Sequence, residues 1–149
     1  MTRQQAIVLV EDNDDDAELT TMAFAEAKVS NPIVRLVDGV DALEYFFCQG
    51  RWAGRDPADA PAVVLLDLKL PGLSGLEVLS ALRADARTKH LPVVVLTSSD
   101  EDADRLAAYG HHVNSYVRKP VDYDQFVAAT RQLGVYWMML NLPPPARLG

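Results

Sequence analysis

Carboxylate and ammonium side chains follow three short apolar segments of this chain, each rich in β-branched residues. Glu11 and Asp12 come after the first segment, Asp67 after the second and Lys119 after the third. In a parallel sheet the carboxyl ends of the strands share one edge, so these side chains should meet there. Neighbouring carboxylates repel one another where water is partly excluded, and a divalent cation relieves that repulsion. The pattern therefore predicts a metal-assisted acceptor of a phosphoryl group.

Strands and helices are expected to alternate along the chain. The first helix should begin with Asp14 as its N-cap and the second with Asp38, because both residue types accept hydrogen bonds from a first helical turn. Strict alternation predicts an α/β fold with a doubly wound parallel sheet covered by helices on both faces. The expected strands are 7 to 10, 33 to 37, 63 to 66, 92 to 96 and 115 to 118, and the expected helices are 14 to 28, 38 to 47, 74 to 84, 100 to 109 and 121 to 133.

Composition restricts the functional classes. The chain has 149 residues, of which 49% are hydrophobic, and this is enough for one packed domain followed by a short extension. Its net charge of -7, concentrated near residues 11 to 16, argues against a nucleic-acid partner. The single cysteine, Cys48, indicates a reducing compartment. There is neither a signal-peptide pattern nor a run of about 20 apolar residues, so a cytoplasmic protein without a membrane span is expected.

Four motifs resemble the receiver domain of two-component response regulators. The resemblance covers residues 6 to 133 and implies a flavodoxin-like, five-stranded sheet in the order 2-1-3-4-5 with five helices. The motifs are Val-Glu-Asp-Asn at 10 to 13, Leu-Leu-Asp-Leu-Lys-Leu-Pro-Gly-Leu-Ser-Gly at 65 to 75, Val-Leu-Thr-Ser-Ser at 95 to 99 and Tyr-Val-Arg-Lys-Pro at 116 to 120.

A narrower resemblance is to single-domain regulators that partner phytochrome-type histidine kinases. It is carried by Asp-Gly-Val-Asp-Ala-Leu-Glu at 38 to 44, by the loop that follows, and by Tyr136-Trp137 with Leu142-Pro143. It implies a histidine kinase as the phosphoryl donor, with a bacterial phytochrome as the candidate.

The resemblance assigns roles at the site. Asp67 becomes the phosphoacceptor, a carboxylate nucleophile that forms an aspartyl phosphate. Glu11, Asp12, Asp67 and the backbone carbonyl of Lys69 would hold Mg²⁺, which prefers oxygen ligands. The longer Glu11 side chain, where many receivers carry Asp, favours contact with the ion through water.

Further roles fall on the fourth and fifth strands. The hydroxyl of Thr97 and the ammonium of Lys119 would contact the phosphoryl group. Thr97 and Tyr116 would form a switch in which the ring turns inward after phosphorylation. The simpler alternatives are a strand-end threonine bonded to local backbone, a solvated lysine and a half-buried tyrosine. Asp14, Asp15 and Asp16 belong to a helix N-terminus rather than to the metal site.

The last residues, 134 to 149, are more apolar than a free terminus requires. They are interpreted as an extension of the 1 to 133 receiver domain that pairs two copies in a homodimer, and packing within one chain is the alternative. The expected dimer contacts are Tyr136, Trp137, Met138, Leu140 and Leu142.

Competing functions differ in the chemistry they need. An aspartyl-nucleophile phosphatase wants a second Asp two residues after the nucleophile, and Lys69 stands there. A flavodoxin-like cofactor binder needs a phosphate-cradling loop after the first strand, where this chain is acidic. A partner-binding receiver without phosphorylation and a phosphate sink without an output partner remain alternatives. The favoured hypothesis is a signalling protein that is not an enzyme, although it catalyses its own phosphorylation and slow dephosphorylation.

Overall fold

The computed structural model describes residues 5–97, 110, 113, 115–118, 123, 124, 127, 128 and 131. In this part of the chain five parallel strands form one sheet in the order β2-β1-β3-β4-β5, which confirms the predicted fold class and strand order. The strands are β1 (Ile7–Val10), β2 (Ile33–Leu36), β3 (Val63–Asp67), β4 (Val93–Thr97) and β5 (Ser115–Arg118).

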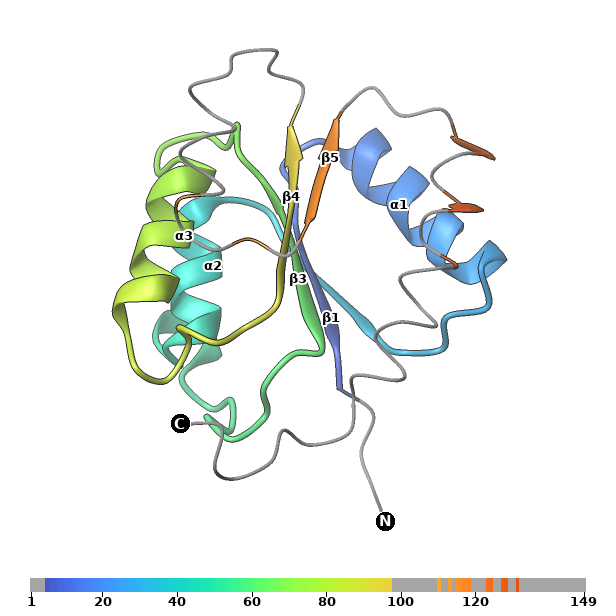
Figure 1. Ribbon diagram of the computed structural model, residues 1–149. Coiled ribbons are helices and arrows are strands. Elements are labelled where there is room, and N and C mark those ends of the chain that lie inside the picture. Colours follow the sequence, from blue (N-terminus) through green and yellow to red (C-terminus); the bar gives the residue numbers. More distant parts are fainter. Residues whose placement is uncertain are drawn as a thin grey trace.

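Helices lie on both faces of the sheet (Figure 1). One face carries α2 (Gly39–Phe46) and α3 (Gly75–Ala84), and the other carries α1 (Asp14–Glu26). Residues 123, 124, 127, 128 and 131 are helical, as expected for a last helix, and Val127 packs on Ala23 of α1. The helix expected at 100 to 109 lies outside the described residues, and the next residue, Gly110, is helical.

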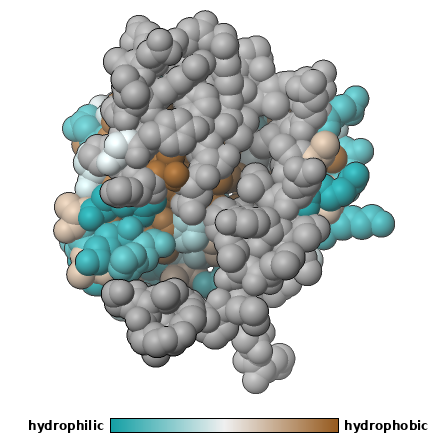
Figure 2. All heavy atoms as spheres, in the orientation of Figure 1, coloured by the Kyte–Doolittle hydropathy of each residue, from teal (hydrophilic) through white to brown (hydrophobic). Residues whose placement is uncertain are grey.

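Alternating side chains divide the core into two clusters. Val8 and Val10 of β1 point toward α2 and α3, whereas Ile7 and Leu9 point toward α1. Each of these four side chains is at most 4% exposed, because a parallel sheet with both faces covered buries every position of a central strand. Figure 2 shows hydrophilic side chains on the outer flanks and hydrophobic ones between them.

Helix starts follow the capping chemistry, with one correction. Asp38 caps α2 as predicted, since its side chain accepts from the amide of Asp41. The predicted cap of α1, Asp14, is wrong: Asn13 is the N-cap and accepts from the amide of Asp16. Asp14 is instead the first helical residue, and the three aspartates fill the first turn, where negative charge suits the helix dipole.

Two other features bear on the sequence expectations. Among the described residues no helix is long and apolar enough to cross a membrane. Cys48 is half-buried and carries a free thiol.

A buried carboxylate attaches the segment after α2 to that helix. Asp41 is 7% exposed and accepts two hydrogen bonds from Arg51, at 2.9 and 2.7 Å, and one from the indole of Trp52 at 2.8 Å. Both donors lie in the short 3₁₀ turn η1 (Gly50–Trp52), within the loop between α2 and β3. The bond from Arg51 is the main reason that the pKa of Asp41 lies below its ordinary value of 3.8.

Glycine is required where α3 meets the end of β3. A Cβ at Gly75 would lie 2.2 Å from the carbonyl oxygen of Asp67 and 2.5 Å from the Cα of Leu68. The amide of Gly75 donates to the carbonyl of Leu68 at 2.9 Å, which closes the β3–α3 loop. Ser74 caps α3 in a capping box with Glu77. The start of α3 is therefore fixed against the backbone of Asp67.

Replacing Asp41 by Asn should lower the free energy of unfolding by about 2 kcal/mol, because one amide cannot replace a carboxylate that accepts several donors. Urea titrations followed by tryptophan fluorescence measure this loss. The control is Glu18→Gln, which also removes one negative charge but does so at an exposed residue.

The stabilisation by Asp41 should depend on pH. Because the pKa of Asp41 is lower in the folded than in the unfolded state, the stabilisation is complete above the unfolded pKa and is lost as pH falls through the folded pKa. The difference between wild type and variant should therefore be constant from pH 7 to 5 and shrink below 3.8. Equal stabilities at pH 7 would contradict this account of Asp41.

Replacing Gly75 by Ala should lower the free energy of unfolding by about 1–3 kcal/mol, since the added methyl must displace backbone atoms. Thermal or urea unfolding measures the loss. Gly54→Ala is the control, because nothing lies within 4 Å of a Cβ built at Gly54. If both variants were as stable as wild type, the close approach of α3 to Asp67 would be wrong.

Candidate functional site

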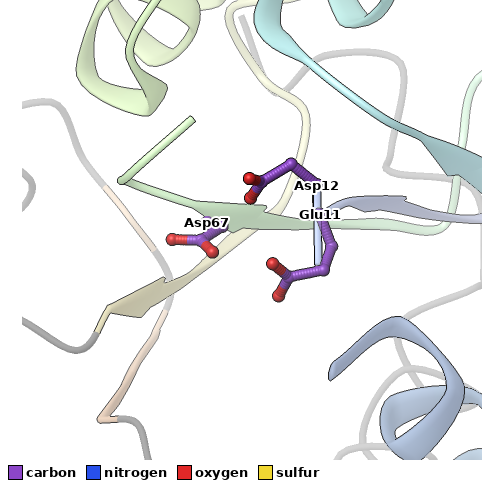
Figure 3. A group of neighbouring side chains, drawn as sticks. All are labelled: Glu11, Asp12 and Asp67. Carbon is purple, nitrogen blue, oxygen red and sulfur yellow. The ribbon is translucent and has the colours of Figure 1, made fainter. Parts of the chain in front are cut away.

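Three carboxylates meet at the carboxyl ends of β1 and β3: Glu11 and Asp12 follow β1, and Asp67 is the last residue of β3. Val10 pairs with Leu66 in the sheet, so the residues that follow, Glu11 and Asp67, lie at the same level. One oxygen from each of Glu11, Asp12 and Asp67 lies within 4.8 Å of the other two. Figure 3 shows these side chains gathered at the ends of the two neighbouring strands.

Burial differs within this cluster. Glu11 is 0% and Asp67 6% exposed, whereas Asp12 is exposed. Two of the carboxylates thus lie in surroundings where charge repulsion is poorly screened, and the third is open to solvent. The cluster combines a strong field for cations with a route by which an ion can enter.

Backbone hydrogen bonds fix the two buried acids. The amide of Glu11 donates to the carbonyl of Leu36 in β2 at 3.0 Å. Asp67 ends β3, and its Oδ1 accepts from the amide of Lys69 at 2.9 Å. That bond restrains one oxygen of the Asp67 carboxylate at the point where the chain leaves the strand.

The donor set suits a hard divalent cation. Carboxylate oxygens are the preferred ligands of Mg²⁺ and Mn²⁺, and Mg²⁺ commonly keeps several waters while it binds one or two carboxylates. An ion among the three groups would offset their mutual repulsion. The residues present therefore fit such an ion.

The remaining expected site residues are described only in part. Thr97 ends β4, one residue after Leu96, which pairs with Asp67, and Tyr116 lies in β5 opposite Val95. Their backbones are described, but their side chains are not. Lys119 and the expected dimer contacts lie outside the described residues, namely Tyr136, Trp137, Met138, Leu140 and Leu142.

Arg35 is a neighbour of the cluster that the motifs did not indicate. It lies in β2, where its Nε donates to the carbonyl oxygen of Glu11 at 3.0 Å and its Nη1 to Asp14 at 2.7 Å. The available signal was a lone arginine in the otherwise apolar run Ile-Val-Arg-Leu-Val at 33 to 37. Hydrophobic periodicity does not show what such a side chain contacts.

Comparison with known sequences identifies the domain. The family model of the response regulator receiver domain matches residues 7–131. Among curated proteins, the chain is 40% identical over 138 residues to the "probable methanogenesis regulatory protein FilR2" of Methanothrix harundinacea, and this match covers 93% of the chain and 86% of that relative.

Solved structures give the same fold. The phosphorylated cyanobacterial phytochrome response regulator RcpA has a TM-score of 0.83 and 33% identity, over 95% of this chain and 99% of that one. The bacteriophytochrome response regulator RtBRR has a TM-score of 0.79 and 46% identity, with 95% and 85% covered. The Mn²⁺-bound form of response regulator Rcp1 has a TM-score of 0.79 and 31% identity, with 89% and 94% covered.

These matches extend over most of the chain and of each relative. Receiver domains bind a divalent metal, and the acidic cluster of Glu11, Asp12 and Asp67 lies at the carboxyl edge of the same sheet. The chain therefore belongs to the response regulator receiver domain family of two-component systems, and it is related to phytochrome response regulators.

Proposed function

We propose that this protein is a single-domain response regulator that accepts a phosphoryl group from a histidine kinase onto Asp67 in a Mg²⁺-dependent reaction. The observation that carries the proposal is the convergence of three carboxylates within 4.8 Å of one another, one of them on Asp67 at the end of β3. The protein signals by contact with other proteins and is not an enzyme acting on a separate substrate.

The transfer makes one bond and breaks one. A carboxylate oxygen of Asp67 attacks the phosphorus of a phosphohistidine on the kinase, so a P–O bond forms as the P–N bond breaks. The released imidazole nitrogen keeps the electron pair and takes up a proton. Asp67 starts this step already oriented, because the Lys69 amide holds its Oδ1 at 2.9 Å.

Glu11, Asp12, Asp67 and the carbonyl of Lys69 are the proposed metal ligands, with Glu11 acting through water. When bound, Mg²⁺ supplies positive charge that neutralises the transferred phosphoryl group. Support comes from the geometry of the carboxylate cluster and from the related Rcp1, whose solved structure is a Mn²⁺-bound form.

Thr97 and Lys119 are proposed to contact the phosphoryl oxygens, and Thr97 and Tyr116 to form the switch. The sheet register supports this, since the backbone of Thr97 is one residue beyond the partner of Asp67 and β5 pairs with β4. Lys119 would donate a charge-assisted hydrogen bond, and its ammonium group would offset charge on the product.

A phytochrome-type kinase is the proposed donor. RcpA is a phytochrome response regulator and RtBRR is a bacteriophytochrome response regulator. Each match covers 95% of this chain. FilR2 is 40% identical to this chain and is named a probable methanogenesis regulatory protein, so similarity at this level is not confined to phytochrome response regulators. A phosphotransfer profile against the histidine kinases of the source genome decides between donors. The reaction is proposed to take place in the cytoplasm.

Two domain parts are proposed: the receiver at 1 to 133 and an extension at 134 to 149 that pairs two copies. The apolar residues of the extension, including Trp137, support this proposal.

A phosphate sink without an output partner remains the alternative to signalling by contact with other proteins.

Incubation of the protein with Mg²⁺ and acetyl phosphate should add one phosphoryl group, and Asp67→Asn should gain none. Intact-mass spectrometry measures this, and Asp15→Asn, an exposed acid on α1, is the equal-charge control that should be labelled like wild type. Chelation of Mg²⁺ should abolish labelling while circular dichroism stays unchanged, because the core of the sheet is apolar. Persistent labelling of Asp67→Asn would reject Asp67 as the acceptor.

Removing residues 136 to 149 should convert the dimer to a monomer without unfolding the domain. Light scattering gives the mass, and circular dichroism checks the fold. Trp137→Ala, as a smaller change at one expected contact, should weaken dimerisation by at least about tenfold, in line with a central aromatic anchor. A dimer of unchanged affinity after truncation would assign the extension to packing within one chain.

A further inference from the structure

Arg35 spans the segment that joins β1 to α1. Its Nε donates to the carbonyl oxygen of Glu11 at 3.0 Å, and its Nη1 donates to Oδ1 of Asp14 at 2.7 Å. Glu11 and Asp14 lie on either side of the segment that contains Asp12. Because a guanidinium is planar and rigid, these two bonds set the separation of the two ends of that segment.

Asp12 depends on this arrangement more than its neighbours do. Glu11 and Asp67 are buried, so packing restricts their side chains, but Asp12 is exposed. The position of an exposed carboxylate is set mainly by its backbone. Two hydrogen bonds join β2 to the backbone just before Asp12. The Glu11 amide donates to the carbonyl of Leu36, and the Glu11 carbonyl accepts from the Nε of Arg35.

Stability alone explains the placement of Arg35 poorly. The side chain of Asp14 is 90% exposed, and ion pairs with such a group add little to stability. The Nη2 atom of Arg35 is buried and has no hydrogen-bond partner in the part of the chain that the structure describes. A buried donor without a partner costs free energy, so the guanidinium is held beside the acidic cluster against that cost.

We propose that Arg35 is a positioning residue for the divalent ion. It clamps residues 11 to 14 so that the carboxylates of Glu11 and Asp12 keep the spacing to Asp67 that the ion requires, and it holds Asp14 outside the site. The inference rests on the proposed function in one respect, namely that the ion binds at this cluster.

The positive charge of Arg35 and its two hydrogen bonds should change cation affinity in opposite directions, so variants at position 35 can separate the two effects. A positive charge near three carboxylates by itself weakens cation binding, so loss of the charge alone should tighten it. Loss of the clamp should weaken binding. Lys at position 35 keeps the charge but cannot hold two acceptors in a fixed plane, whereas Ala removes both properties.

Isothermal titration calorimetry measures the affinity for Mg²⁺. The electron paramagnetic resonance signal of free Mn²⁺ measures the affinity for Mn²⁺, and neither experiment depends on phosphoryl transfer. Arg35→Lys should weaken binding by about tenfold, as expected for a group that orients metal ligands. Arg35→Ala should weaken it as well, by less than Arg35→Lys or by a similar factor. Wild-type affinity in Arg35→Lys, with tighter binding in Arg35→Ala, would show that only charge matters and would overturn the proposal.

A second pair of variants tests the clamp without altering the strand. Asp14→Asn and Asp15→Asn remove one negative charge each from the first turn of α1, but Arg35 forms its ion pair with Asp14. Asp14→Asn should weaken Mg²⁺ binding several-fold more than Asp15→Asn, and equal effects would overturn the clamp. This comparison decides the question even if Arg35→Lys folds poorly.

The outcomes also separate this inference from the proposed function. Wild-type protein that binds Mg²⁺ more tightly than Arg35→Lys but is not labelled by acetyl phosphate would reject the function and keep the clamp. Labelled wild type with unchanged Mg²⁺ affinity in Arg35→Lys and in Asp14→Asn would reject the clamp and keep the function. No Mg²⁺ binding by wild type would overturn both.

Discussion

Repulsion between carboxylates at the edge of the sheet is the constraint on which the functional site depends. The nearest oxygens of Glu11 and Asp67 are at most 4.8 Å apart, and both residues are buried. At an effective dielectric constant of about 20, two unit charges no farther apart than this repel by at least roughly 3.5 kcal/mol. A divalent ion would turn this cost into attraction, and in the proposed reaction it would also let an anionic phosphoryl group approach the carboxylate of Asp67.

The fold supplies this arrangement through backbone geometry. Parallel pairing of β1 and β3 brings Glu11 and Asp67 to one level, and the amide of Lys69 donates a hydrogen bond to the Asp67 carboxylate. Gly75 allows the first turn of α3 to touch the Asp67 backbone, so the end of β3 is held against a capped helix. The proposed phosphoryl transfer needs mainly positioning and charge stabilisation, and the fold brings these carboxylates together.

The sequence predicted the parts that follow from short-range patterns. Apolar runs located the five strands to within one residue at each end, and strict alternation predicted the parallel sheet that the structure has. The cap of α1 was misassigned by one position because Asn13 and Asp14 are both competent caps, and only backbone geometry distinguishes them.

Side-chain networks between segments were not predictable in this way. Arg35 and the Asp41–Arg51–Trp52 contacts join residues 10 or more positions apart, and neither periodicity nor a motif specifies such pairs. The roles of Thr97, Tyr116 and Lys119 remain predictions that rest on the resemblance, and the role of the extension at 134 to 149 remains a prediction that rests on its apolar composition.

The most direct test of the central claim is a crystal structure of the protein soaked in Mn²⁺, with the ion located by its anomalous scattering. The account predicts a peak among Glu11, Asp12 and Asp67, at about 2.0–2.3 Å from oxygens of Asp12 and Asp67. An ion bound elsewhere, or no peak among these carboxylates at a concentration that supports labelling, would contradict it.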